Sequence, residues 1–326
     1  MTDLETYIRQ FMSLRRAPGS VWTSLTKSRA PHKPILLLAV LDLVSRNVIT
    51  SSFIQVTGDL IELNELFSLY WRRIVPLGQY SSIAFPFSRL HNEDFWKLVP
   101  LSGQEITPAI LNNITSVSQL RAVTMGARID EALYRLLLQP ECRSALRDAL
   151  LRSCFSDEAI AVLQEQITIN SEAYNYSLEL VHKAYLPLVQ EIIKEETYLP
   201  VVRDQGFRRI VVNTYDHRCA LCGVRIITPE GHTAVDAAHI VPWSRSRNDD
   251  IRNGMALCKL CHWAFDEGMV GISDSYDVIT SRQIAVNPNV PGFLLTLSGR
   301  NIIAPSEREL WPAQQYLADH RREWRF

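Results

Sequence analysis

The chain has 326 residues, of which 47% are hydrophobic and 21% are charged, a composition that fits a folded protein of two or three domains and excludes global disorder. A net charge of −1 would by itself argue against a nucleic-acid partner, but two mildly basic regions, at the N-terminus and over residues 203–262, flank an acidic middle. No apolar run is long enough to span a bilayer and the N-terminus carries no secretory signal, so we expect a cytoplasmic protein with no membrane partner.

The N-terminal half is predicted to mix helices with short strands. Residues 1–14 have an amphipathic helical pattern, and residues 15–32, rich in Pro, Gly, Ser and Arg, are typical of a loop. A helix over 34–45 is expected to open at a proline and is apolar nearly all round, which indicates a buried core helix. Residues 48–100 contain short β-prone pieces around a predicted helix at 60–71.

The middle of the chain is acidic and has a helical pattern over 130–166. A further helix is predicted over 172–196, with Ser171 as its cap and a kink at Pro187. The apolar stripes of this region are most simply packing faces, so it is interpreted as a connector.

These patterns predict an α+β protein in three parts. A mixed α/β domain covers 1–158, a helical connector covers 159–200, and a C-terminal domain covers 201–326. After a helix over 205–215 the last part changes to short strands and turns and holds most of the cysteine and histidine.

Two Cys-x-x-Cys pairs stand in the C-terminal part with 35 residues between them: Cys219 and Cys222, then Cys258 and Cys261. Four thiolates in two such pairs can close a tetrahedral structural zinc site. The alternative, redox chemistry, needs one pair and not two. Cys142 and Cys154 lie in helical patterns and are expected to be inert buried thiols.

A second set of polar residues lies in and beside the segment between the pairs. His239 ends a predicted strand, Asn253 follows 14 residues later, and His262 follows 9 residues after that. His262 and Asp266 are four apart on a predicted helix over 258–268 and so share one face, where an imidazole and a carboxylate can hold one cation.

This order resembles the HNH nuclease family, whose fold is called ββα-metal. The resemblance covers about 215–270 and rests on both cysteine pairs, Ala238-His239-Ile240, Asn253-Gly254, Cys261-His262 and Phe265-Asp266-x-Gly268. It implies a zinc-stapled nuclease domain. His239 would be the general base, Asn253 would brace the loop or touch the metal, and His262 and Asp266 would bind the catalytic ion.

One position departs from the pattern of many family members, which carry Asp or His immediately before the general base as a metal ligand. Ala238 stands there, and Asp236, a candidate replacement, would face the other side of the strand. A site of one imidazole, one carboxylate and waters suits Mg²⁺, Mn²⁺ or Ni²⁺. Arg245, Arg247 and Arg252 are expected to meet phosphates.

The stretch 15–33 carries five basic residues and no acid, ending in Arg29, His32 and Lys33 at the start of the predicted buried helix. Helix N-termini attract phosphate. The plain alternative is a capping loop with incidental charge.

The N-terminal part also resembles the sulfur-binding domain of restriction endonucleases that recognise phosphorothioate-modified DNA, a domain usually fused to an HNH nuclease. The resemblance covers about 5–155 and rests on Pro31-His32-Lys33-Pro34 with the apolar run after it, on Phe85-Pro86-Phe87 and on Asp94-Phe95-Trp96-Lys97-Leu98. Phe85 and Pro86 stand where the family has a Tyr-Pro pair at the sulfur cavity. Arg29, His32, Lys33 and Arg89 would be the basic residues beside it.

Together, the two resemblances imply a modification-dependent restriction endonuclease whose partner is double-stranded DNA carrying backbone phosphorothioate. One nuclease site per chain favours a homodimer for cutting both strands. An apolar wall costs sulfur little but leaves an oxyanion poorly solvated, which would give a preference of roughly 1–3 kcal/mol. The alternatives are an HNH nuclease that reads another mark such as methylcytosine, with Trp22, Trp71 and Trp96 around a flipped base, and a non-catalytic zinc-stapled DNA-binding protein.

Overall fold

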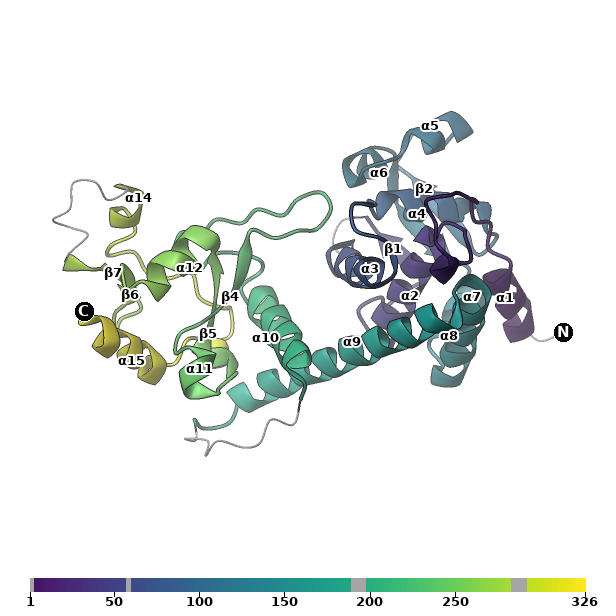
Figure 1. Ribbon diagram of the computed structural model, residues 1–326. Helices are drawn as coiled ribbons and strands as arrows, with labels where there is room; N and C mark the ends of the chain where they lie inside the picture. Colours follow the sequence, from purple (N-terminus) through teal and green to yellow (C-terminus); the bar gives the residue numbers. More distant parts are fainter. Residues whose placement is uncertain (1–2, 57–59, 189–197, 283–291) are drawn as a thin grey trace. The chain divides into compact units, whose positions relative to one another are not determined.

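The computed structural model describes residues 3–56, 60–188, 198–282 and 292–326 (Figure 1). The chain divides into two compact units, which are Met1–Thr168 with Thr228–His232, and Ile169–Ile227 with Thr233–Phe326. The helical middle therefore does not form a separate unit: helix α9 (Asp157–Ala184) contributes its first part to one unit and its remainder to the other. Among the described helices, none is both long and apolar enough to cross a membrane.

The first unit is a helical domain built around one small sheet. Strands β1 (Phe53–Gln55), β2 (Trp96–Pro100) and β3 (Thr124–Ile129) pair antiparallel in the order β1-β3-β2. The helices are α1 (Asp3–Met12), α2 (His32–Ser45), α3 (Leu60–Ile74), α4 (Ala84–Arg89), α5 (Pro108–Asn113), α6 (Val117–Val123), α7 (Glu131–Leu137), α8 (Pro140–Cys154) and the start of α9.

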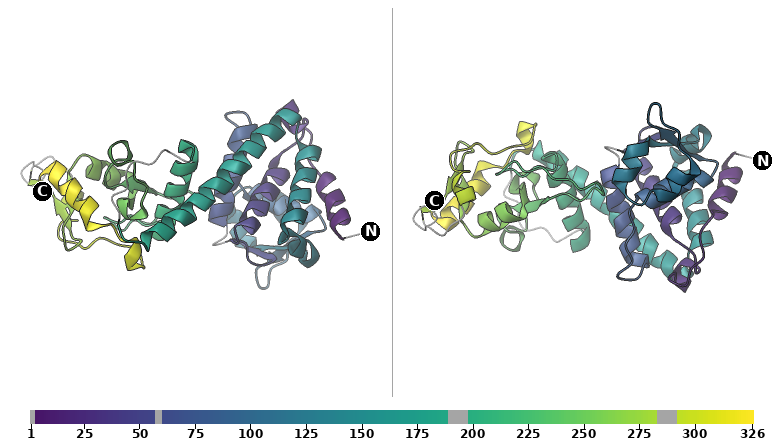
Figure 2. Two further views of the ribbon diagram at one scale, coloured as in Figure 1. Left: turned by 90° about the horizontal axis from the view of Figure 1, so that it is seen from below. Right: turned by 90° about the horizontal axis from the view of Figure 1, so that it is seen from above.

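Helix α2 is the centre of this unit and is buried on every side, as its apolar sequence predicts. It packs against α3, α4, α7 and α8 (Figures 1 and 2). The helix begins at His32, so Pro34 lies in the first turn and not at its first residue. Asp42, a buried acid on α2, accepts hydrogen bonds from Tyr70 and Arg147, which satisfies its charge inside the core.

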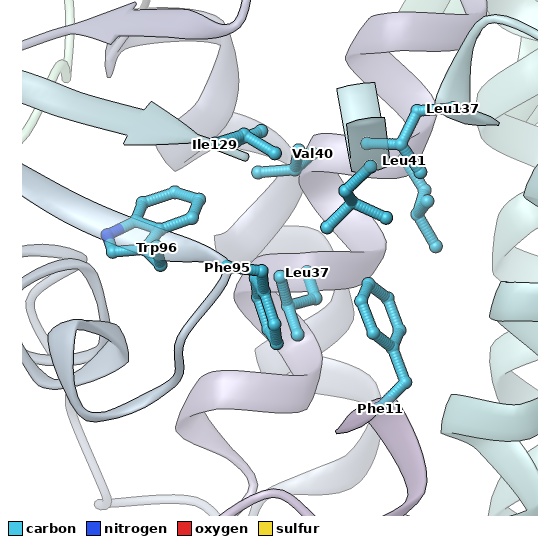
Figure 3. A pocket seen from close by; sticks show the side chains of 9 residues that line it. Phe11, Leu37, Val40, Leu41, Phe95, Trp96, Ile129 and Leu137 are labelled. Carbon is cyan, nitrogen blue, oxygen red and sulfur yellow. The ribbon is translucent and has the colours of Figure 1, made fainter. Parts of the chain in front are cut away.

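The core between α1, α2 and the sheet is closely packed. Phe11, Phe95 and Trp96 meet the leucines of α2 around a gap of about 10 Å³, at the lower limit for one water (Figure 3). Trp96 is 1% exposed and its indole nitrogen donates to the carbonyl of Phe87. It is a core residue, so it does not line a pocket for a flipped base.

Three sequence predictions need correction. Helix α9 continues through Ser171, which therefore caps nothing: apolar residues before Ser171 pack into the first core, and those around and after it pack into the second. That helix ends at Ala184, before Pro187, and the predicted part over 189–196 lies outside the described residues. The third correction is the start of α2, since His32 and not Pro34 is its first residue.

The second unit consists of small sheets held between helices. Strands β4 (Val235–His239) and β5 (Gly254–Cys258) pair antiparallel, as do β6 (Val270–Ile272) and β7 (Val278–Thr280). The helices are the end of α9, α10 (Pro200–Thr214), α11 (Trp243–Ser246), α12 (Lys259–Asp266), α14 (Gly292–Leu295) and α15 (Gln314–Trp324). Helix α10 packs on both β4 and β5, and α12 follows β5 directly (Figure 1).

Candidate functional site

Of the three predicted catalytic residues, His239 and His262 line one pocket, together with the predicted metal ligand Asp266, whereas Asn253 does not. His239 is the last residue of β4 and pairs with Gly254 at the start of β5, while α12 returns along the same hairpin. The pocket has a volume of about 300 Å³, and His239, His262 and Asp266 all line it. Strand, strand and helix thus bring together groups that are up to 27 positions apart in the sequence.

The imidazole of His239 is held from two directions. Its Nε2 lies 2.8 Å from Oδ1 of Asp249, and its ring stacks on Phe207 at 4.0 Å between centroids with a 6° interplanar angle. Asp249 is buried, and its other oxygen accepts hydrogen bonds from Tyr176 and from two guanidinium nitrogens of Arg203. Burial raises the pKa of Asp249, but these hydrogen bonds and the Arg203 charge outweigh it, so the pKa lies below its ordinary value.

Sequence reasoning missed this network. Asp249 lies ten residues after His239 in the loop before Asn253. An acid in this loop was the only feature of the sequence that could have indicated a partner for His239. Arg203 reaches the site because α10 packs on β4 and β5, and Tyr176 reaches it from α9, where its hydroxyl meets Asp249. Nothing in the local sequence marks either residue.

Asn253 was expected either to brace the loop or to touch the metal, and its contacts fit the bracing role. It is 0% exposed, its Oδ1 accepts from the backbone amide of Val241, and its Nδ2 donates to the carbonyls of Val241 and Asn248. Both amide ends are therefore used inside the loop. The glycine after it is required by space, since a Cβ on Gly254 would lie 2.8 Å from the ring of Phe207, the residue on which His239 stacks.

His262 and Asp266 offer one nitrogen and one oxygen donor side by side on α12. Nε2 of His262 lies 3.4 Å from Oδ2 of Asp266, and both side chains are partly exposed to the pocket. Burial raises the pKa of Asp266, an effect that the neighbouring His262 opposes. Such a pair fits a hard divalent cation whose remaining positions are filled by water and phosphate oxygens.

Asp236 does not belong to this pocket. Its carboxylate forms an ion pair of 2.9 Å with Arg208, and its place on β4 faces away from His239. Ala238 is fully buried and leaves no ligand at its position. Another acid, Glu323 of α15, lines the pocket instead and is paired with Arg245 at 2.5 Å.

The three arginines expected to meet phosphates differ in their surroundings. Arg252 is largely buried, forms an ion pair with Asp250 and donates to the carbonyl of Leu186, so it stabilises the loop. Arg245 is half-exposed beside the pocket. Arg247 lies over the ring of Trp243, a pocket residue, at 5.8 Å.

The four paired cysteines form one cluster, in which all four sulfurs lie within 4.8 Å of one another. Tetrahedral zinc with Zn–S bonds of about 2.3 Å needs sulfurs about 3.8 Å apart, and Sγ of Cys222 lies 3.7 Å from Sγ of Cys258. The donor set and its spacing therefore fit a structural metal. Of the remaining two cysteines, Cys154 is buried as expected, whereas Cys142 is only half-buried.

In the N-terminal unit, His32 is the centre of an aromatic cluster. Its ring lies 5.2 Å from Trp22, 4.7 Å from Trp71 and 4.9 Å from Phe85 between centroids. Burial lowers the pKa of His32 to about 4, and its Nδ1 is buried with no hydrogen-bonding partner among the described residues. The free protein therefore presents a neutral imidazole here, not a cation.

The other predicted DNA-binding residues fall into two groups. Arg89 lies over the ring of Phe85 at 5.3 Å, and Arg29 is exposed in the loop before α2. Lys33 and Pro86 are buried, and Lys33 is paired with Glu93 at 2.5 Å. Burial lowers the pKa of Lys33, with partial compensation by Glu93. Lys33 is thus both buried and paired, whereas Arg29 is exposed and Arg89 donates to Asn112 through both terminal nitrogens.

Comparison with known families agrees with this division of the chain. Residues 8–171 match the family described as ScoMcrA-like, DNA sulfur-binding domain, and residues 219–273 match the HNH endonuclease family. Because the first match covers half of the chain, the protein belongs to the ScoMcrA-like DNA sulfur-binding domain family. Its C-terminal unit contains an HNH endonuclease domain over residues 219–273.

Whole-chain comparisons add little. No curated protein matches the chain. Among solved structures, a modification dependent TagI restriction endonuclease is 23% identical over 36% of this chain and 36% of that chain, with a TM-score of 0.28. This chain thus spans about a third of that structure, and so partial a superposition describes neither the fold nor the function of this protein.

Proposed function

We propose that this protein is a modification-dependent restriction endonuclease that binds phosphorothioated double-stranded DNA through its N-terminal unit and hydrolyses phosphodiester bonds at its HNH site. The observation that carries the proposal is the pocket that His239, His262 and Asp266 share, in a chain that also carries a DNA sulfur-binding domain.

In this proposal His239 accepts the proton of the attacking water. A divalent ion, Mg²⁺, Mn²⁺ or Ni²⁺, held by His262 and Asp266 would stabilise charge on the phosphate and on the leaving oxygen. A zinc ion at the four cysteines would hold the hairpin and α12 together. A homodimer would supply one site for each strand.

Sulfur recognition is assigned to the aromatic cluster beside α2. Sulfur in a phosphorothioate is larger and more weakly hydrated than oxygen, so it loses less on contact with an apolar wall. Phe85 and the neutral ring of His32 offer such a wall, and Arg89 lies next to it to meet the remaining charge of the phosphate.

The proposal is tested by cleavage of one duplex prepared with and without a backbone phosphorothioate, at matched salt. We expect wild-type protein with Mg²⁺ or Mn²⁺ to cut the modified duplex, a chelator to abolish cutting, and His239→Ala to leave only a small residual rate. Equal cleavage of both duplexes would contradict sulfur dependence and favour another mark, which a methylcytosine duplex then tests. Binding without metal-dependent cleavage of any duplex would indicate a non-catalytic DNA-binding protein.

A further inference from the structure

The imidazole of His239 contacts a buried carboxylate, that of Asp249. The side chain of Asp249 is 3% exposed, yet it makes four hydrogen bonds: Oδ1 contacts His239, and Oδ2 accepts from Tyr176 at 2.9 Å and from Nε and Nη2 of Arg203 at 3.0 and 2.9 Å. Arg203 is itself fixed, with its guanidinium 3.3 Å from the ring centroid of Trp243. A buried carboxylate with this many donors is ionised and immobile.

An ionised carboxylate can only accept hydrogen bonds, so Nε2 of His239 must carry the proton that joins the two groups. The neutral ring then has its lone pair on Nδ1, which has no hydrogen-bonding partner within the part of the chain that the structure describes. Stacking on Phe207 fixes the plane of the ring, and the hydrogen bond to Asp249 fixes its rotation in that plane. His239 lines the same pocket as His262 and Asp266.

We propose that Asp249 is the positioning residue of the nuclease: it holds His239 in the Nε2–H tautomer, so that Nδ1 is the atom that takes the proton from water. The inference rests on the nuclease function proposed above. In the step, one O–H bond of water breaks and its proton moves to Nδ1, the oxygen bonds to phosphorus, and the P–O3′ bond breaks, with the 3′ oxygen taking a proton from solvent. The imidazolium formed at His239 is stabilised by the adjacent negative charge of Asp249.

The adjacent acid offers a matched control. Asp250 lies in the same loop and forms a largely buried ion pair with Arg252, but it makes no contact with His239. Asp249→Asn and Asp250→Asn thus remove the same charge from neighbouring positions, and only the first removes the partner of the base.

The test measures kcat and KM for cleavage of phosphorothioated duplex by both variants, in the wild-type and His239→Ala backgrounds. We expect Asp249→Asn to lower kcat roughly 10²- to 10⁴-fold with little change in KM, the range for loss of an oriented base, and to cause no further loss in His239→Ala. Asp250→Asn should stay within a few-fold of wild type. An equal loss on both backgrounds, or unchanged kcat in Asp249→Asn, would overturn the proposal.

A second measurement holds even if Asp249→Asn does not fold, because it uses the wild-type protein. Imidazole ¹⁵N chemical shifts of the full-length chain, with His239 assigned by comparison with His239→Ala, should report the Nε2–H tautomer. An Nδ1–H tautomer would refute the positioning role. Failure to prefer phosphorothioate would contradict the proposed specificity alone. The assignment of Asp249 would still be decided by these two results, with the kinetics measured on whichever duplex the protein cuts.

Discussion

His32 shows how burial changes what a residue can do. In the sequence His32 belongs to a basic stretch, and an exposed imidazole there could gain a proton near neutral pH. In the structure its ring is enclosed by Trp22, Trp71 and Phe85, and burial lowers its pKa from 6.5 to about 4. A neutral ring with an unused Nδ1 suits contact with a weakly hydrated sulfur better than it suits attraction of phosphate from a distance.

The same residue should make stability depend on pH. Unfolded chains protonate His32 below about pH 6.5, whereas the folded protein does so only near pH 4, so the unfolded state binds more protons in this window. Stability from the neutral, buried ring is complete above pH 6.5 and is lost as pH falls towards 4. We expect wild type to lose about 2 kcal/mol more than His32→Phe between pH 7 and pH 5. Denaturant unfolding at both pH values measures this, and parallel losses in the two proteins would refute it.

At the scale of elements, the two cysteine pairs lie where one bound metal ion would join the β4–β5 hairpin to α12. Cys258 ends β5 and Cys261 lies in α12, so a metal bound there would set the angle between the strand and the helix that carries His262 and Asp266. Gly268 then ends this segment with φ +63°, and a Cβ there would strike Trp324, another residue of the pocket wall.

Removal of one sulfur should therefore unfold the C-terminal unit. Cys258→Ser is expected to lose bound zinc and the thermal transition of that unit, since structural zinc contributes directly to folding. Cys142→Ser, a change at a half-buried cysteine outside the cluster, is the matched control and should keep both. Metal analysis and calorimetry provide the measurement. Wild-type protein without metal, together with an unchanged transition in Cys258→Ser, would eliminate the zinc site.

At the scale of the whole molecule, the chain forms two compact units, and each holds its own buried core. The residues proposed to read sulfur all lie in the first unit, and those proposed to cut lie in the second. Substitutions in the first unit should therefore change the affinity for DNA, and substitutions in the second should change the rate of cleavage without changing the affinity.

Binding measurements with the full-length chain test this separation. His239→Ala should bind phosphorothioated duplex as tightly as wild type and retain a preference of roughly 5- to 150-fold over unmodified duplex, which corresponds to 1–3 kcal/mol. Phe85→Ala should shrink this ratio, because it removes apolar wall, whereas Arg29→Ala should weaken both duplexes alike by losing an exposed charge. An unchanged ratio in Phe85→Ala would place the sulfur contact elsewhere on the domain.

Much of the protein was determined by local sequence. The apolar run of α2 predicted a buried helix, the spacing of the cysteine pairs predicted a metal cluster, and helical periodicity placed His262 and Asp266 on one face, because ligand geometry and helical periodicity are short-range rules. The role expected for His239 came from the resemblance to HNH nucleases. What the tertiary structure decided was the surroundings. Lys33 became a buried partner of Glu93, Asn253 a loop brace, and Ser171 an interior helical residue. Asp249 acquired Tyr176 and Arg203 from two helices distant in sequence. Burial and long-range hydrogen bonds arise only when segments far apart in the chain pack together, so a local sequence pattern does not predict them.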